Sequence, residues 1–135
     1  MMANKQATFV DAMVLIYAAR GQDIIRKQRA LFVLADPDRE FIASEYLRLE
    51  VLPQAIRYKW KNEQRFYERF FLGVSRWVDG TQLLSPAFDI ACRHGVGAMD
   101  ALHIAAALLA GAEFVTAERP TKPIYQAYTK VVSIY

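Results

Sequence analysis

Short apolar runs that alternate with amphipathic segments constrain this chain more than any other feature. Four runs of five residues are mostly apolar, and each is followed by a pattern typical of a helix. We therefore expect strands at 7–11, 40–44, 82–86 and 113–117, with a fifth at 130–135. Strands that alternate with helices form a mostly parallel sheet covered on both faces, so the predicted fold class is α/β.

The segments between the predicted strands carry helix signals. Ser44 is placed to cap the helix after the second strand, and Pro53 is expected to bend or shorten that helix. Gly111 marks the end of the most apolar helix. No repeat, low-complexity tract or linker interrupts the chain, so we expect one domain over residues 1–135. The predicted helices are 12–20, 23–35, 45–57, 62–77, 86–94 and 98–111.

Composition excludes several classes of protein. The single cysteine, Cys92, rules out an intramolecular disulfide and a cysteine-rich zinc site. No apolar stretch reaches the roughly 18 to 20 residues that cross a bilayer, and the first residues lack the apolar region of a secretory signal. We therefore expect a cytoplasmic protein with no membrane partner. The net charge of +3 is compatible with nucleic acid but does not argue for it alone.

Four acidic residues lie at strand ends or in helices next to them. Asp11 ends the first strand, Glu50 lies in the helix after the second, Asp100 begins the helix before the fourth, and Glu118 follows the fourth. In parallel sheets of this kind, ligands bind beyond the carboxyl ends of the strands. Crowded carboxylates repel one another and raise their pKa values, and a hard divalent cation such as Mg²⁺ relieves that repulsion.

Each of these acids also has a purely structural interpretation. Asp11 could cap the helix that follows it, and Asp100 could interact favourably with its helix dipole. Glu50 and Glu118 could be solvated surface residues. His103, one turn after Asp100, is interpreted as a packing or hydrogen-bonding residue rather than a metal ligand. With only one other histidine in the chain, a multi-histidine zinc site is poorly supported.

The segment 57–77 is both basic and aromatic. Its cations could bind an RNA backbone, and its aromatic rings could stack on unpaired bases. An aromatic stripe at helical spacing is more often core or dimer interface, which is the favoured interpretation for Phe66, Phe70 and Trp77. The candidate RNA-binding cations are Arg57, Lys59, Lys61, Arg65 and Arg69. The aromatic candidates for base stacking are Tyr58, Trp60, Phe66, Tyr67, Phe70 and Phe71.

Three motifs, in this order, resemble the PIN domain family, close to the VapC-type toxin ribonucleases. The motifs are FVDAMVLIYAA (9–19), FIASEYLRLEVL (41–52) and MDALHIAAALLAGAEFVTAERP (99–120). The resemblance implies an α/β/α sandwich around a mostly parallel five-stranded sheet in the order 3-2-1-4-5. It also implies hydrolysis of RNA that depends on Mg²⁺ or Mn²⁺, a homodimer, and inhibition by a small antitoxin protein.

The same resemblance implies a site. It implies that metal binding and catalysis belong to Asp11, Glu50, Asp100 and Glu118. Glu50 is selected over Glu45 because it follows Ser44 by six positions. Thr116 falls on a hydroxyl position often beside the metal in such proteins, and Thr116 and His103 are the auxiliary candidates.

Two positions depart from the family's pattern. The first motif reads Asp-Ala-Met where Asp-Thr-Asn or Asp-Ser-Asn is usual, so Ala12 and Met13 lack the polar groups expected to steady Asp11 or a metal-bound water. Glu118 stands where Asp is common. The alternative to an active ribonuclease is a degenerate, non-catalytic PIN-type module that binds RNA or a protein partner. A receiver-like or phosphohydrolase domain is disfavoured because no Asp-x-Asp follows the first strand.

Overall fold

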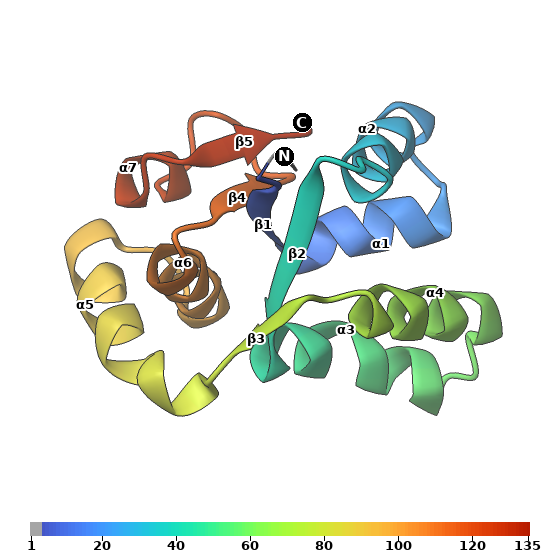
Figure 1. The fold of residues 1–135 in the computed structure, drawn as a ribbon, viewed down its shortest axis with the longest axis horizontal. Coiled ribbons are helices and arrows are strands. Elements are labelled where there is room, and N and C mark those ends of the chain that lie inside the picture. The colour runs from blue at the N-terminus through green and yellow to red at the C-terminus, as the bar shows by residue number, and fades with distance from the viewer. Residues whose placement is uncertain (1–3) are drawn as a thin grey trace.

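One parallel five-stranded sheet forms the centre of the molecule. The computed structural model describes residues 4–135. The strand order β3-β2-β1-β4-β5 confirms the predicted α/β class and topology, with β3 and β5 at the two edges (Figure 1). The strands are β1 (Gln6–Val10), β2 (Arg39–Ser44), β3 (Arg76–Val78), β4 (Glu113–Thr116) and β5 (Val131–Ser133).

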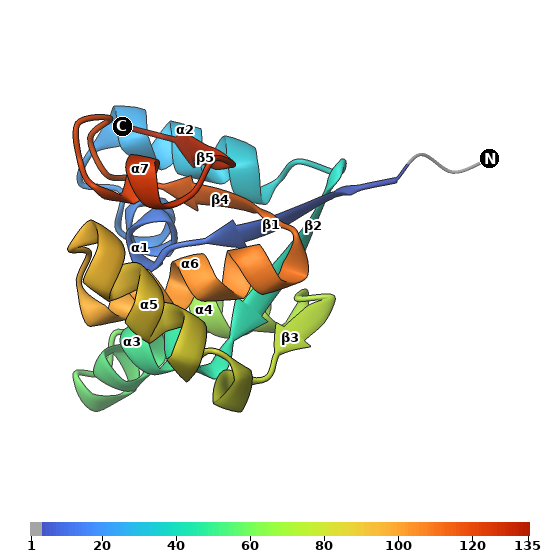
Figure 2. The same ribbon diagram turned by 90° about the vertical axis from the view of Figure 1, so that its left-hand side faces the viewer.

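Helices cover both faces of this sheet. The α1–α2 and α3–α4 hairpins lie on one side, and α5 and α6 lie on the other (Figures 1 and 2). No helix within residues 4–135 is long and apolar enough to cross a bilayer. The helices are α1 (Ala12–Arg20), α2 (Ile24–Leu34), α3 (Glu45–Arg57), α4 (Lys61–Leu72), the 3₁₀ turn η1 (Gly80–Gln82), α5 (Leu84–His94), α6 (Ala98–Ala110) and α7 (Ile124–Ala127).

The core forms where α6 packs against the central strands. All residues of 101–107 in α6 are buried, which accounts for the alanine-rich sequence of this helix. Small side chains let the helix approach the sheet closely, and Phe9 and Phe114 fill the space beneath it with no exposed surface. Their rings stack with centroids 6.0 Å apart. The most apolar helix of the chain is therefore packed firmly against the sheet, and Asp100 lies in its first turn.

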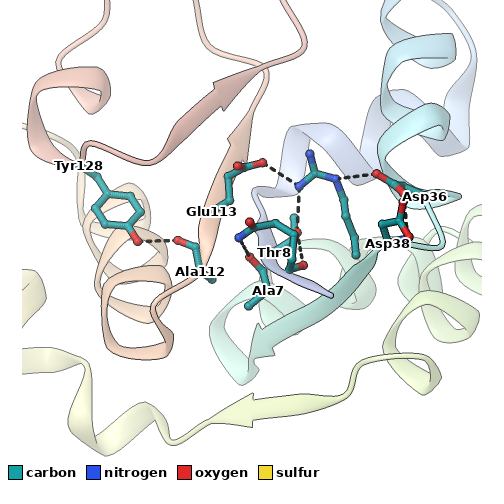
Figure 3. A network of polar contacts seen from close by, with 9 residues as sticks. Ala7, Thr8, Asp36, Asp38, Ala112, Glu113 and Tyr128 are labelled. Carbon is teal, nitrogen blue, oxygen red and sulfur yellow. Dashed lines mark hydrogen bonds and ion pairs between the residues drawn. The ribbon is translucent and has the colours of Figure 1, made fainter. Parts of the chain in front are cut away.

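A partly buried arginine connects three strands at the amino-terminal end of the sheet, away from the acids. The Arg39 guanidinium donates to Thr8 Oγ1 over 2.9 Å and to Glu113 Oε1 over 2.8 Å (Figure 3). Its Nε lies 3.3 Å from Asp36 Oδ2. The Tyr128 hydroxyl donates to the backbone carbonyl of Ala112, between α6 and β4, as Figure 3 also shows. These contacts fix β1, β2 and β4 relative to one another without involving the opposite edge.

The predicted third strand is wrong. The segment 82–86 lies in η1 and the first turn of α5, and the third strand is instead β3, only three residues long. Arg76 and Trp77 are exposed, so β3 shows no apolar run. The predicted helix 62–77 was also too long, because α4 ends at Leu72. Trp77 therefore does not share a helix face with the aromatic residues of α4.

Of the three helix signals at Ser44, Pro53 and Gly111, only the one at Gly111 acts fully as predicted. Pro53 neither shortens α3 nor ends it. It removes the bond to the Leu49 carbonyl, but both residues are exposed, so water can hydrate that oxygen. Ser44 occupies the N-cap position without a capping side-chain bond. Gly111 ends α6 with φ 63°, as predicted, in the left-handed region that glycine favours.

Candidate active site

Asp11 is the most buried of the four candidate acids, with 6% of its surface exposed. It follows β1 directly and caps α1, where its Oδ1 accepts the backbone N–H of Val14 over 3.1 Å. Its Oδ2 accepts the hydroxyl of Thr116, across the sheet in β4, over 2.5 Å. The structural interpretation of Asp11 as a helix cap is therefore correct. The second oxygen shows that the same carboxylate also belongs to a contact between two strands.

Burial raises the pKa of the Asp11 carboxyl to about 6, well above its usual value of 3.8. The hydrogen bonds from Thr116 and Val14 act against this shift, as does the nearby His103 ring. The charge of Asp100 adds to the increase. Ionised Asp11 is thus held in place but poorly solvated, a condition that a nearby cation would relieve.

Thr116 links Asp11 to Glu118. Its side chain is fully buried at the end of β4, and its Oγ1 accepts the backbone N–H of Glu118 over 3.1 Å while donating to Asp11. The Glu118 carbonyl accepts the hydroxyls of Tyr125 over 2.9 Å and Ser133 over 3.1 Å. Three hydroxyl groups therefore hold the backbone of Glu118, while its side chain remains only partly buried.

Asp100 lies in the first turn of α6, half-buried and opposite the other acids. Burial raises the pKa of the Asp100 carboxyl, and the charges of Glu118 and Glu50 raise it further, while His103 lowers it. Within residues 4–135, the side chains of Asp100 and Glu118 make neither a hydrogen bond nor an ion pair. The carboxylates of Asp100 and Glu118 therefore repel each other and have no partner in this part of the chain, and Asp100 also repels the buried Asp11.

Glu50 belongs to the same neighbourhood through His103. The Nε2 of His103 lies 2.7 Å from Oε1 of Glu50, and the imidazole is buried, with its ring centroid 5.3 Å from that of Phe9. Its Nδ1 is buried without a hydrogen-bond partner among the described residues. Glu45 has 72% of its side chain exposed, against 36% for Glu50, and contacts Arg48 at 3.6 Å. The structure thus brings Glu50, not Glu45, toward the acidic edge.

The four carboxylates suit a hard divalent cation, although they are not arranged as a complete set of metal ligands. Mg²⁺ prefers a few carboxylate oxygens and retains several waters. Among the residues that the structure describes, no three histidine, cysteine, aspartate or glutamate side chains already converge on one point as metal ligands. The four acids are electrostatic neighbours, and neither Glu50 nor Glu118 is buried.

The Asp-Ala-Met motif leaves Asp11 better supported than the sequence alone suggests. Ala12 is buried and Met13 is 42% exposed, so neither supplies a polar side chain. Other residues nevertheless support Asp11, because the Val14 N–H and the Thr116 hydroxyl donate to its two carboxylate oxygens. What the motif does leave out is a polar side chain at the exposed position 13, where a water could be held.

The basic and aromatic segment divides into three parts. Tyr67 and Phe71 are core residues, whereas none of the three residues named for the stripe, Phe66, Phe70 and Trp77, is buried. Phe66 and Phe70 line an open apolar groove of about 600 Å³ between α2, β2 and α4, which includes none of the four acids. Tyr58 and Trp60 are exposed in the turn between α3 and α4. The five candidate RNA-binding cations are all exposed at the end of α3, in this turn and along α4.

Two residues near Glu118 were missed by sequence reasoning. Tyr125 lies in α7, a four-residue helix that was not predicted, and Ser133 lies in β5. Both donate to the same carbonyl, 7 and 15 residues earlier in the chain. Local patterns carry no signal of that convergence. The pairing of β4 with β5 brings Ser133 to this carbonyl, and the placement of α7 brings Tyr125 to it.

These features define an α/β domain with an acidic edge at the carboxyl ends of its parallel strands. A family model for the PIN domain matches residues 8–120, and the chain therefore belongs to the PIN domain family. Comparison with curated proteins gives no match.

Solved structures share this fold. A chain of a toxin–antitoxin complex from Klebsiella pneumoniae superposes with a TM-score of 0.69 at 19% identity, covering 95% of this chain and 98% of that one. A chain of VapBC2 from Rickettsia felis, bound to a DNA fragment from its promoter, gives 0.67 at 11% identity, with 95% and 97% covered. PAE2754 from Pyrobaculum aerophilum gives 0.62 at 19% identity, with 98% and 92% covered. At these identities the likeness establishes the fold alone.

Proposed function

We propose that this protein is an endoribonuclease that uses Mg²⁺ or Mn²⁺ to hydrolyse RNA phosphodiester bonds. The observation that carries the proposal is the grouping of a buried Asp11, with its pKa raised to about 6, beside two carboxylates that have no partner in the described chain. A purely structural set of acids would be paired with cations or hydrated at the surface. A divalent cation offsets the repulsion of all of them at once.

Asp11, Asp100 and Glu118 are the proposed metal ligands, with Glu50 binding directly or through water. A bound divalent ion lowers the pKa of its water and stabilises charge on the phosphate oxygens. The remaining work belongs to the chain. Thr116 and the Val14 N–H orient Asp11, and His103 orients Glu50. Hydrolysis by water needs no side-chain nucleophile, and the exposed Cys92 has no part in it.

The proposed partners are an RNA substrate, a small antitoxin protein and a second copy of the chain, in the cytoplasm. Two structural neighbours come from a toxin–antitoxin complex and from VapBC2, which supports a role as the toxin of such a pair. The apolar groove between α2 and α4 offers a surface of the right chemistry for a segment of an antitoxin. The exposed cations along α3 and α4 suit the RNA backbone.

Cleavage of single-stranded RNA tests the proposal. Protein with Mn²⁺ or Mg²⁺ is expected to cut an RNA panel, and EDTA is expected to stop it. Asp11→Asn and Asp100→Asn should each abolish cutting, because each removes a charged ligand and leaves a side chain of similar shape. Cutting that is independent of metal and survives both substitutions would not come from this site, and the lack of any cutting that EDTA stops would contradict the proposal.

A degenerate, non-catalytic PIN-type module is the second candidate. Ala12 and Met13 in the first motif favour it, as does the lack of a preformed set of three metal ligands in residues 4–135. Such a module would bind RNA or a protein partner without cutting. Absence of cleavage across the RNA panel at saturating Mn²⁺, together with retained RNA binding, would select this candidate.

A further inference from the structure

The turn between α3 and α4, taken with the last residue of α3 and the first of α4 (57–61), carries the most exposed pair of stacked rings that the structure records. We call these five residues the platform turn. The rings of Tyr58 and Trp60 have centroids 5.3 Å apart and an interplanar angle of 28°. Tyr58 is 58% exposed and Trp60 is 38% exposed. Large aromatic rings stacked on each other in solvent form a flat surface that can accept a further ring.

Arg20 contacts the Trp60 ring, and two residues of α4 hold Arg20 in this position. The Arg20 guanidinium, at the end of α1, lies 5.0 Å from the centre of the indole ring. Its Nε donates to Glu63 Oε1 over 2.9 Å, and the buried Tyr67 donates to the other oxygen of Glu63 over 3.1 Å. The platform turn is therefore ordered before any ligand arrives, which reduces the entropy lost on binding.

Lys59 adopts a backbone conformation that lysine seldom occupies. Its φ is 58°, and it is the only residue other than glycine with a positive φ among the described residues. Its N–H donates to the Ile56 carbonyl over 3.2 Å, and the next N–H, of Trp60, donates to the Ala55 carbonyl over 2.9 Å. This pair of bonds defines a Schellman motif at the end of α3, whose left-handed position normally holds glycine. A lysine kept at this strained position points to a function for its cation.

The platform turn is also strongly positive. Arg57, Lys59 and Lys61 are all exposed, and none of them forms an ion pair with any residue in 4–135. The nearest acid in sequence, Glu63, is already engaged by Arg20. Three unpaired cations around a stacked aromatic pair match a ligand that has both negative charges and flat rings.

We propose that the platform turn binds single-stranded RNA, with an unpaired base stacked on Tyr58 and the adjoining phosphates contacting Arg57, Lys59 and Lys61. This inference rests on the proposed function for the identity of the nucleic acid. Base stacking on aromatic rings tolerates any base and requires that the base be unpaired. A protein partner would instead require acidic or apolar complementarity, and the three cations favour the polyanion.

The platform turn follows α3, the helix that carries Glu50 of the acidic edge. Tyr58 follows Glu50 by eight residues, so the two are about 12 Å apart along the axis of α3, at about 1.5 Å per residue. An RNA strand bound at the platform turn would extend along α3 toward the acids. The turn therefore acts as a positioning site for RNA and takes no part in the cleavage chemistry.

Tryptophan fluorescence tests this binding directly. The chain has two tryptophans, so Trp77→Phe leaves Trp60 as the only one. In EDTA, where no metal-dependent cleavage occurs, a 12-nucleotide oligouridylate is expected to quench Trp60 and give a binding curve. Tyr58→Ala should weaken binding by about 5- to 150-fold, the range found when a stacking ring is removed. Tyr58→Phe, which keeps the ring, should bind like the parent protein.

Lys59→Gly separates binding from folding. Glycine relieves the left-handed strain, so the melting temperature is expected to rise by about 2–5 °C. The same change should weaken oligouridylate binding and reduce its salt slope by about 0.7, because one phosphate contact is lost. Phe32→Ala, at another exposed aromatic position, and Lys130→Ala, at another exposed lysine, are the matched controls and should not change affinity.

The outcomes distinguish this inference from the proposed ribonuclease activity. Unchanged oligouridylate affinity in both Tyr58→Ala and Lys59→Gly overturns the inference, even if the protein cuts RNA with Mn²⁺. The absence of any Trp60 quenching overturns it as well. Weaker binding in both variants, with a higher melting temperature for Lys59→Gly, supports the inference even if no cleavage is ever found.

Discussion

The Thr116 hydroxyl donates a 2.5 Å hydrogen bond to the Asp11 carboxylate, joining the end of β4 to the start of α1. The same oxygen accepts the N–H of Glu118. One buried side chain thus sets the position of two of the acids. This relationship explains why a hydroxyl residue at the end of an otherwise apolar strand is compatible with full burial, since both its donor and acceptor functions are satisfied.

Thr116→Val should separate the orientation of Asp11 from the packing of β4. Valine has nearly the same shape but no hydroxyl, so Asp11 loses the hydrogen bond that lowers its pKa and accepts metal less readily. Loss of a supporting contact of this kind reduces metal affinity or activity by about 10- to 100-fold. The shift in melting temperature on titration with Mn²⁺ measures the affinity. Thr116→Ser is the control, and an equal loss in both variants would contradict this role.

The stability of the metal-free protein should fall as the pH rises from about 4 to 6. The folded-state pKa of Asp11 is about 6 and the unfolded value is 3.8, so the folded state binds more protons across this window. The stabilisation is complete below the unfolded pKa and is lost as the pH rises through the folded pKa. The difference corresponds to about 3 kcal/mol, at about 1.4 kcal/mol per pH unit.

Urea unfolding of the wild type and Asp11→Asn in EDTA, from pH 4 to pH 7, measures this effect. Because other groups also titrate, the informative quantity is the difference between the two free energies of unfolding at each pH. The difference should change steadily across the window in favour of Asp11→Asn as the pH rises. A difference that is independent of pH would mean that Asp11 ionises normally in the folded protein.

Glu50→Gln should reduce RNA cleavage strongly, whereas Glu45→Gln should have little effect. Both glutamates are in α3, but Glu50 faces His103 at 2.7 Å and Glu45 is exposed beside Arg48. Initial rates at saturating Mn²⁺ compare the two variants directly, and Glu45→Gln is the matched control. Equal rates for the two variants would show that Glu50 does not contribute to cleavage.

Met13→Asn should increase cleavage by up to about 10-fold, the lower end of the range for residues that support a metal site. Position 13 is exposed and adjoins the capping residue of α1, so an amide there can hold a water near Asp11 without disturbing the core. The substitution should leave the melting temperature nearly unchanged, since surface substitutions usually alter stability little. A rate equal to that of the wild type would show that the missing amide does not limit the reaction.

Arg39→Met should weaken the fold without altering the site. It leaves Glu113 and the Thr8 hydroxyl without their shared donor, which should cost about 1–3 kcal/mol of unfolding free energy for these partly buried groups. Because the arginine lies at the amino-terminal end of the sheet, the Mn²⁺-induced change in melting temperature should stay that of the wild type. A reduced metal response would mean that the two ends of the sheet are coupled.

Sequence patterns predicted the sheet well wherever a strand is buried on both faces. β1, β2 and β4 are central strands, and their apolar runs were recognised within one residue of their bounds. The edge strand β3 was missed because two of its three side chains face solvent and so give no apolar run. The apolar residues of 82–86 were mistaken for it, since Leu83 is buried by helical rather than strand packing.

The candidate site was predictable in position but not in detail. Asp11, Asp100 and Glu118 follow from the rule that ligands bind where parallel strands end, and the structure places them within reach of one another's charge. Their roles as metal ligands remain predictions. The support from Thr116, Tyr125 and Ser133 could not be predicted from local patterns, because each of these hydrogen bonds depends on how separate segments meet in space.

The backbone N–H of Val14 donates to the Asp11 carboxylate, so this aspartate stabilises the start of α1 whether or not it binds a metal. An acid that also begins a helix is retained by selection for folding, so it persists in descendants that have lost their chemistry. Asp100 and Glu118 support no other group through their side chains in residues 4–135, and selection for folding does not protect them. In a related chain, the loss of Asp100 or Glu118 therefore indicates lost activity, whereas the presence of Asp11 does not by itself indicate activity.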